Sequence, residues 1–225
     1  MLLELTSDQE LFQSTTAKFL ERHAPVAELR RLHDDPAGFR SDYWRQGAEL
    51  GWTSLLVSER DGGASISGKG LIDLTLVAHE FGRHAAPGPL MSTNMVAAAL
   101  SAASKSQDLI SDLIAGTSIA AWCVSEGAPN DGVGNIAFDV AIAGDELVLN
   151  GVKRPVESAD KASHLLVTGR TGSGLTQVLV PTATKGVSVT AARLLIDNIC
   201  GNGHLPLFVL HDFDFDGFKN RQVKR

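Results

Sequence analysis

The spacing of apolar residues changes at Gly116, and this change constrains the fold more than any other feature of the 225-residue chain. Before Gly116, bulky apolar residues recur at every third or fourth position, which is the period of an amphipathic helix. After Gly116 they fall into short runs separated by turn residues, which is the pattern of β-strands. The sequence therefore predicts an α+β fold: an all-α domain over residues 1–116, a small β-barrel or sandwich domain over residues 117–195, and an atypical tail over residues 196–225.

Helix signals are frequent in the first of these regions. Ser7 and Glu10 form a capping-box pattern, which satisfies backbone N–H groups that have no partner at a helix start. This helix is expected to end near Pro25. Further helices are predicted over residues 39–50, 71–81, 91–100 and 109–115.

Short apolar runs bounded by turn residues predict the strands of the second region. They cover residues 118–125, 136–143, 146–149, 164–168, 176–180 and 187–190. Asn150-Gly151 is the strongest local hairpin signal in the chain. We therefore expect residues 144–158 to form a tight meander of short strands.

Composition and charge argue against several classes of function. The formal net charge of −6 and the pI near 5.6 disfavour a nucleic-acid partner, because binding phosphates needs clustered Lys and Arg. Apolar runs such as 119–124 and 205–210 are far shorter than the roughly 20 residues that span a bilayer, so no membrane partner is expected. Cys123 and Cys200 lie far apart without a secretory leader, which favours a reducing cytoplasm.

The strand predicted near residue 121 ends in a polar loop that has the features of a ligand site. It delivers Ser125 and Glu126 into a Gly-rich segment over residues 128–134. Hydroxyl and backbone N–H donors then lie beside the Trp122 indole, which suits a flat, anionic, heteroaromatic ligand.

These residues resemble the start of the β-domain of the acyl-CoA dehydrogenases. That family shows an aromatic residue before Thr-Glu-Pro, and later Leu-Asn-Gly-x-Lys, which here are Trp122, Ser125-Glu126 and the run ending at Lys153. The helical region resembles the same family in the order of three short motifs. These are Leu50-Gly51-Trp52, Glu59-Arg60-Asp61-Gly62-Gly63 and Glu80-Phe81-Gly82-Arg83.

The resemblance implies FAD-dependent α,β-dehydrogenation of an acyl-CoA thioester, in which a carboxylate removes the α-proton and the flavin receives the β-hydride. The family's base is a glutamate in a C-terminal helical bundle, and the family-like sequence here stops near residue 195. We therefore assign no catalytic residue and expect the chain to be incomplete on its own. A homo- or hetero-oligomeric partner is expected to supply the bundle, and the chain alone is not expected to dehydrogenate acyl-CoA.

Seven positions match ligand-binding positions of the family. Those implied for FAD are Trp122, Val124, Ser125, Pro155 and Glu157, and those implied for the acyl-CoA substrate are Asn130 and Asp131. Ser125 keeps the hydroxyl of the family threonine. Pro155, however, replaces a tryptophan that packs on the flavin, and Glu157 replaces a threonine that bonds to it.

An alternative function remains open, namely a non-catalytic scaffold or assembly remnant that has lost flavin binding. Pro155 and Glu157 favour it, whereas Trp122 and Ser125 favour the flavoprotein. On composition alone, a tryptophan on a short strand more often belongs to a core, and a lysine after a hairpin, such as Lys153, more often lies on a solvated face.

The tail contains three alternating aspartates, Asp212, Asp214 and Asp216, that would lie on one face of a strand. Such a row can hold Mg²⁺ and vaguely resembles a toprim-type metal site. An EF-hand is excluded because Val223 stands at the twelfth loop position, where glutamate is required. A degenerate strand or a junction with unrelated sequence is the favoured explanation of the row, so no metal ligand is assigned.

Overall fold

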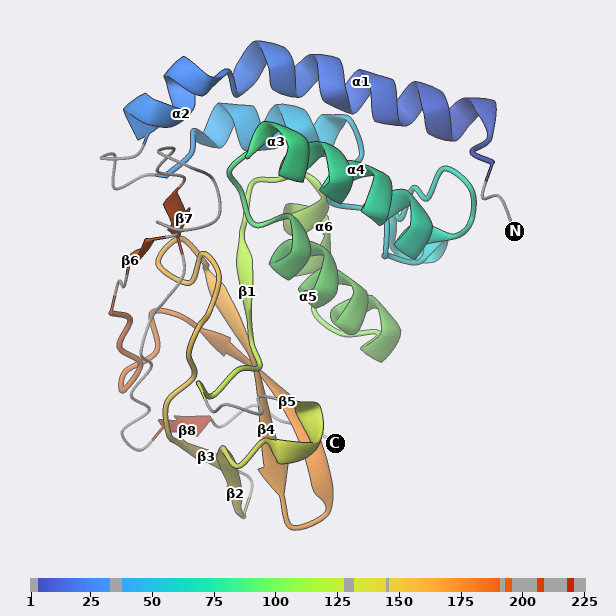
Figure 1. Ribbon diagram of the computed structural model, residues 1–225. Helices are drawn as coiled ribbons and strands as arrows, with labels where there is room; N and C mark the ends of the chain where they lie inside the picture. The colour runs from blue at the N-terminus through green and yellow to red at the C-terminus, as the bar shows by residue number, and fades with distance from the viewer. Residues whose placement is uncertain are drawn as a thin grey trace. The chain divides into compact units, whose positions relative to one another are not determined.

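The computed structural model describes residues 4–32, 38–127, 132–144, 146–190, 193–195, 206–208 and 218–220. The chain divides into two compact units (Figure 1). The helical unit comprises Met1–Ser118 with Leu195–Pro206, and the β unit comprises Ile119–Leu194 with Leu207–Arg225. Helices followed by a mixed sheet confirm the predicted α+β class.

The described part of the helical unit contains α-helices at all the predicted places. They are α1 (Ser7–His23), α2 (Val26–Leu32), α3 (Ser41–Glu49), α4 (Gly70–His84), α5 (Leu90–Ala103) and α6 (Gln107–Ile114), with a 3-10 turn η1 (Glu59–Asp61). α1 packs along α4, and α5 packs against α6 (Figure 1). Of the helices in the described ranges, none has the length and apolar character needed to cross a bilayer.

The capping box of α1 begins one residue earlier than predicted. Thr6, not Ser7, is the cap: its Oγ1 accepts a hydrogen bond from the Gln9 backbone N–H at 3.2 Å, and Gln9 Oε1 accepts one from the Thr6 N–H at 3.1 Å. Gln9 is only 6% exposed, and its Nε2 also donates to Asp73. An amide can accept at the cap and donate to a carboxylate at once, which Glu10 cannot do.

Trp52 forms the centre of the helical core. Its ring is fully buried and meets Phe19 and Phe81 edge to face, with centroids 5.2 and 4.9 Å away. The indole Nε1 donates to Thr16 Oγ1 at 3.2 Å, so the one polar atom of the ring has a partner. Gly47 permits this packing, because a Cβ there would lie 2.1 Å from Trp52 Cε3.

The β unit contains a mixed sheet in the order β1-β4-β2-β3-β8, with β5 paired to β4. Its strands are β1 (Ala120–Cys123), β2 (Asp139–Ala143), β3 (Glu146–Asn150), β4 (His164–Thr171), β5 (Gly174–Pro181) and β8 (Phe218–Asn220). A second, two-stranded sheet joins β6 (Arg193–Leu195) to β7 (Pro206–Phe208). The predicted strand over residues 187–190 is wrong, because these residues are not assigned to any strand.

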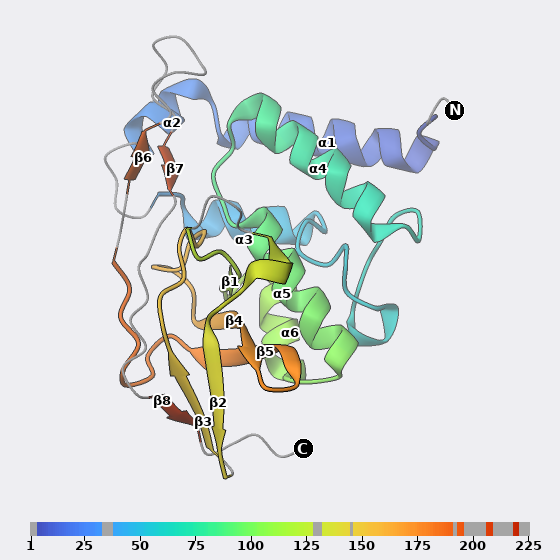
Figure 2. The same ribbon diagram turned by 60° about the horizontal axis from the view of Figure 1, so that its bottom comes forward.

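The meander predicted for residues 144–158 is only partly correct. β2 and β3 do form an antiparallel hairpin, and they lie side by side in Figure 2. The turn of this hairpin follows Ala143, whereas Asn150-Gly151 ends β3 without leading into an adjacent strand. The next strand, β4, pairs in parallel with β1 and antiparallel with β5.

Alternation along the strands gives the sheet one core face and one opposite face. The core cluster includes Ala121, Cys123, Leu165, Val167, Val178 and Val180. Burial raises the pKa of the Cys123 thiol, so this side chain stays an uncharged core residue. Side chains of a strand alternate between faces, so Trp122 and Thr168 lie on the opposite face.

Candidate functional site

The end of β1 is held by a lysine that has no exposed surface. Lys153 Nζ donates to Glu126 Oε1 at 2.7 Å and to the Val124 carbonyl at 3.0 Å. It also lies 5.1 Å from the centre of the Phe138 ring. The expectation that Lys153 lies on a solvated face is therefore wrong. An isolated bridge between Glu126 and Arg154 brings the segment after β3 alongside β1, so the lysine stem enters the interior.

Glu126 uses its carboxylate to hold the loop that follows β1. Its two oxygens accept the backbone N–H groups of Ala137 and Phe138, each at 2.9 Å. Burial raises the pKa of this carboxyl, but the hydrogen bonds from Lys153 and from the two N–H groups outweigh burial and hold the pKa below 4.5. A carboxylate engaged in this way positions a loop and is a poor proton acceptor.

Arg170 on β4 holds the carbonyl groups of the same loop. Its Nε donates to Ile136 O at 3.0 Å, and its Nη2 donates to Gly134 O at 3.1 Å. Glu126 therefore accepts hydrogen bonds from N–H groups of the loop, and Arg170 donates hydrogen bonds to its C=O groups. Two side chains of opposite charge thus fix residues 134–138 against the sheet.

Three of the predicted flavin positions lie together at the end of β1. Trp122, Val124 and Ser125 are all half-buried. Their backbone is fixed, because Val124 O accepts from Lys153 and Ser125 O accepts from the Arg154 N–H at 2.9 Å. The structure thus brings these residues beside the segment that carries the other two flavin positions.

Pro155 and Glu157 lie in that second segment. Pro155 is exposed and Glu157 is half-buried, while Val156 between them belongs to the core cluster of the β unit. Anchoring by Val156 therefore leaves its two neighbours outside the core. The predicted substrate positions Asn130 and Asp131 lie outside the described residues.

The three aspartates of the tail also lie outside the described residues. Within the ranges that the structure does describe, no three His, Cys, Asp or Glu side chains come together as a metal site would require.

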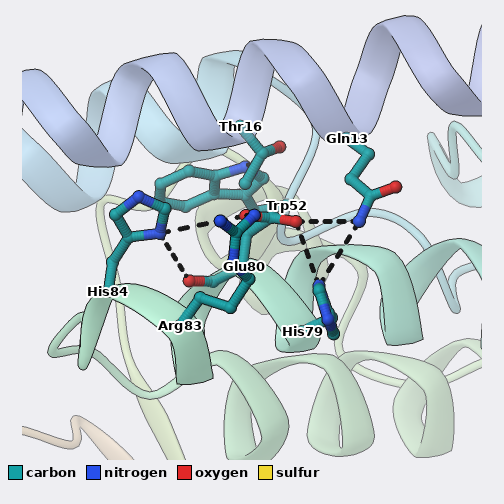
Figure 3. Close-up of polar contacts among 7 residues, drawn as sticks. All are labelled: Gln13, Thr16, Trp52, His79, Glu80, Arg83 and His84. Atoms are coloured by element: carbon teal, nitrogen blue, oxygen red, sulfur yellow. Dashed lines mark hydrogen bonds and ion pairs between the residues drawn. The ribbon is translucent and has the colours of Figure 1, made fainter.

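A second charged cluster, which was not predicted from the sequence, connects α4 to α1 (Figure 3). Glu80, whose side chain is 1% exposed, accepts from Gln13 Nε2 at 2.8 Å and lies 3.0 Å from His79 Nδ1. Arg83 Nη1 donates to its other oxygen at 3.2 Å. Burial raises the pKa of Glu80, but these partners outweigh burial and lower it. The family motif at Glu80 thus has a structural role within the helical unit.

A second buried carboxylate, Asp73 on α4, fixes the loop that precedes this helix. It accepts hydrogen bonds from Gln9 Nε2, Ser65 Oγ, and both the N–H and Oγ of Ser67, at 2.7 to 2.9 Å. Burial raises the pKa of Asp73, but the four donors outweigh burial and lower it. Asp73 therefore stays ionised through hydrogen bonds from neutral donors.

Residues 6–108 match the family model described as "Acyl-CoA dehydrogenase, N-terminal domain". Acyl-CoA dehydrogenase IpdE2 of Mycobacterium tuberculosis is 29% identical over 194 residues, which cover 84% of this chain and 58% of that protein. The chain spans about half the length of the curated relatives it matches.

Two solved structures share the fold over nearly the whole chain. The ChsE4-ChsE5 complex from Mycobacterium tuberculosis gives a TM-score of 0.77 at 23% identity, covering 98% of this chain and 57% of that one. A glutaryl-CoA dehydrogenase from Mycobacterium smegmatis, in complex with FADH2, gives a TM-score of 0.75 at 18% identity, covering 96% and 54%. The helical unit and the β unit thus have the fold of an acyl-CoA dehydrogenase. The chain is therefore similar to the acyl-CoA dehydrogenases in the sequence of its helical region and in its fold.

Proposed function

We propose that this chain contributes the flavin-binding and acyl-CoA-binding side of an FAD-dependent acyl-CoA dehydrogenase. The observation that carries this proposal is the fixed end of β1, where Lys153 holds the Val124 carbonyl and the Arg154 N–H holds the Ser125 carbonyl. A site for a rigid planar cofactor needs this rigidity, because binding then costs little ordering of the protein.

The residues present fit a flavin at most of the proposed positions. Trp122 offers an aromatic face, and Ser125 offers a hydroxyl in place of the family threonine. Glu157 fits least, because a carboxylate repels an electron-rich reduced flavin. When bound, FAD supplies the hydride acceptor of the reaction, while the residues of this chain bind and orient the two ligands.

We propose that the proton-removing base is a residue other than Glu126 and that the chain works in a homo- or hetero-oligomer. Glu126, the carboxylate that directly follows Ser125 in sequence, is engaged by Lys153 and two backbone N–H groups. The similarity in fold to a complex of two proteins supports a hetero-oligomer as one form of this assembly. The proposed compartment is the cytoplasm.

FAD titration of the purified chain tests the proposal, with visible absorbance and quenching of flavin fluorescence as readouts. We expect Trp122→Ala to weaken FAD binding by about 1 kcal/mol, roughly fivefold in Kd, through lost stacking. Ile142→Ala, which removes an exposed side chain from β2, is the matched control and should leave Kd unchanged. An equal Kd for the unaltered chain and Trp122→Ala would reject the placement of the flavin.

The second candidate function, a scaffold without flavin, is favoured by one observation. Glu157 is half-buried where the family has a neutral threonine. A folded chain that binds no FAD in the same titration would support the scaffold and overturn the flavoprotein.

A further inference from the structure

Thr168 connects the Trp122 side chain to two strands beyond its own. Trp122 Nε1 on β1 donates to Thr168 Oγ1 on β4 at 3.1 Å. Gln177 Nε2 on β5 lies 3.5 Å from the same oxygen, and Thr168 and Gln177 are direct partners across the strands. Thr168 itself is only 5% exposed. The three side chains therefore form a polar chain across the face of the sheet opposite the core.

This contact restricts the Trp122 ring in two ways. A threonine in a strand has few χ1 rotamers, so a buried Thr168 presents its oxygen in one direction and fixes the ring that donates to it. Indole also has a single hydrogen-bonding group, the Nε1–H donor. Because Thr168 accepts that hydrogen, Trp122 has only its apolar ring surface left for a ligand.

We propose that Thr168 is a positioning residue, which holds the Trp122 indole in the orientation that stacks on a planar heteroaromatic ring. The inference rests on the proposed function, in which that ring is the isoalloxazine of FAD. Thr168 acts through Trp122 and does not touch the ligand. The site accordingly recognises this part of the flavin by stacking, without a hydrogen bond from the indole.

Thr168→Val tests the inference, because valine keeps the shape of threonine and removes the acceptor oxygen. We expect the variant to bind FAD about fivefold more weakly, the effect of losing one hydrogen bond that orders the site. Thr168→Ser keeps the hydroxyl group, so its Kd for FAD should lie within about twofold of that of the unaltered chain. Thr176→Val is the matched control, since Thr176 alternates onto the core side of β5, and it should leave Kd unchanged.

A double-mutant cycle separates this role from general loosening of the sheet. Phenylalanine at position 122 keeps an aromatic face but has no N–H group, so Thr168→Val should have no further effect in the Trp122→Phe chain. Equal Kd values for the unaltered chain and Thr168→Val, or an equal loss in both backgrounds, would overturn the inference while leaving FAD binding intact. No FAD binding by the unaltered chain would overturn the proposed function and the inference together.

The orientation of the indole can also be measured without flavin. The chain has three tryptophans, so a ¹⁵N-labelled sample gives three indole N–H signals, and Trp122→Phe identifies one of them. We expect this signal to shift and to exchange faster with solvent in Thr168→Val, and to stay in place in Thr176→Val. An unchanged Trp122 signal in Thr168→Val would overturn the role assigned to Thr168.

Discussion

Lys153 and Glu126 form an ion pair at 2.7 Å in which the lysine side chain has no exposed surface and the glutamate side chain is 18% exposed. Buried charges are stable only while their partners remain, because each charge has lost its hydration. The lysine also satisfies the Val124 carbonyl, so the pair fixes both side chains and backbone at the end of β1.

We expect Lys153→Met to lower the free energy of unfolding of the β unit by about 3 kcal/mol, because Glu126 loses its charged partner in a largely buried place. Glu126→Gln should cost a similar amount, since it leaves the ammonium without a counter-charge. Chemical denaturation at pH 7 measures both losses.

The combined variant Glu126→Gln/Lys153→Met is the control for this prediction. Removing both charges should cost less than the sum of the two single losses. Strictly additive losses would show that the two side chains do not depend on one another.

Substitution by alanine at two glycines of the helical unit should change the stability of the chain in opposite directions. Gly47→Ala should destabilise the chain by about 2 kcal/mol, because its Cβ would lie 2.1 Å from the buried Trp52 ring. Gly82→Ala in α4 should stabilise it by about 0.5 to 1 kcal/mol, because alanine has a higher helix propensity and nothing lies within 4 Å of the new Cβ. Thermal unfolding compares the two variants, and an unchanged or raised stability of Gly47→Ala would contradict the packing around Trp52.

Because Asp73 is ionised and hydrogen-bonded in the folded chain, we expect the free energy of unfolding to fall at acid pH. Its folded pKa is below the usual 3.8, so its contribution is fully present above that pH and is lost as the pH falls through the folded pKa. Asp73→Asn should therefore cost about 1 to 3 kcal/mol at pH 7, and the difference from the unaltered chain should shrink below pH 3.8. Urea unfolding at pH 7, 5, 4 and 3 measures this, and a difference independent of pH would be the contrary result.

The hydrogen bonds from Arg170 to the loop after β1 should slow amide hydrogen exchange in that loop. Arg170→Met removes the donors to Ile136 O and Gly134 O, so the amides of residues 135 and 136 should exchange about fivefold faster. Lys185→Met, at another exposed cation of the β unit, is the control. Equal exchange in the two variants would mean that Glu126 alone holds the loop.

The predictions that the structure confirms came from patterns among residues that are close together in the chain. The change of period at Gly116 and the stripes of the helices are local signals, and the structure has helices and strands in those places. The cap is Thr6 and not the predicted Ser7, because Gln9 also donates a hydrogen bond to Asp73, a residue far away in the chain. Propensity alone does not encode such a tertiary contact.

The errors arose where distant segments meet. Lys153 follows a turn signal and so resembles a surface residue, yet the bridge between Glu126 and Arg154 carries its side chain inward. Similarly, the short apolar runs predict where strands lie but not which strands pair with one another. The parallel pairing of β1 with β4 was therefore not predicted. Residues 187–190 have strand propensity, but the pairing is limited to a single bridge at Val187 and no strand extends over them.

The parallel pairing of Ala120 with His164 also has a consequence during synthesis. Among the described strands, β4 is the one that pairs with β1, so β1 has no neighbour until about 40 more residues have been added. At roughly 5 to 20 residues per second, the ribosome needs about 2 to 8 s for this stretch. Throughout that time the nascent chain carries an unpaired strand edge next to a completed helical region, and such an edge is a site where a chaperone binds or aggregation begins.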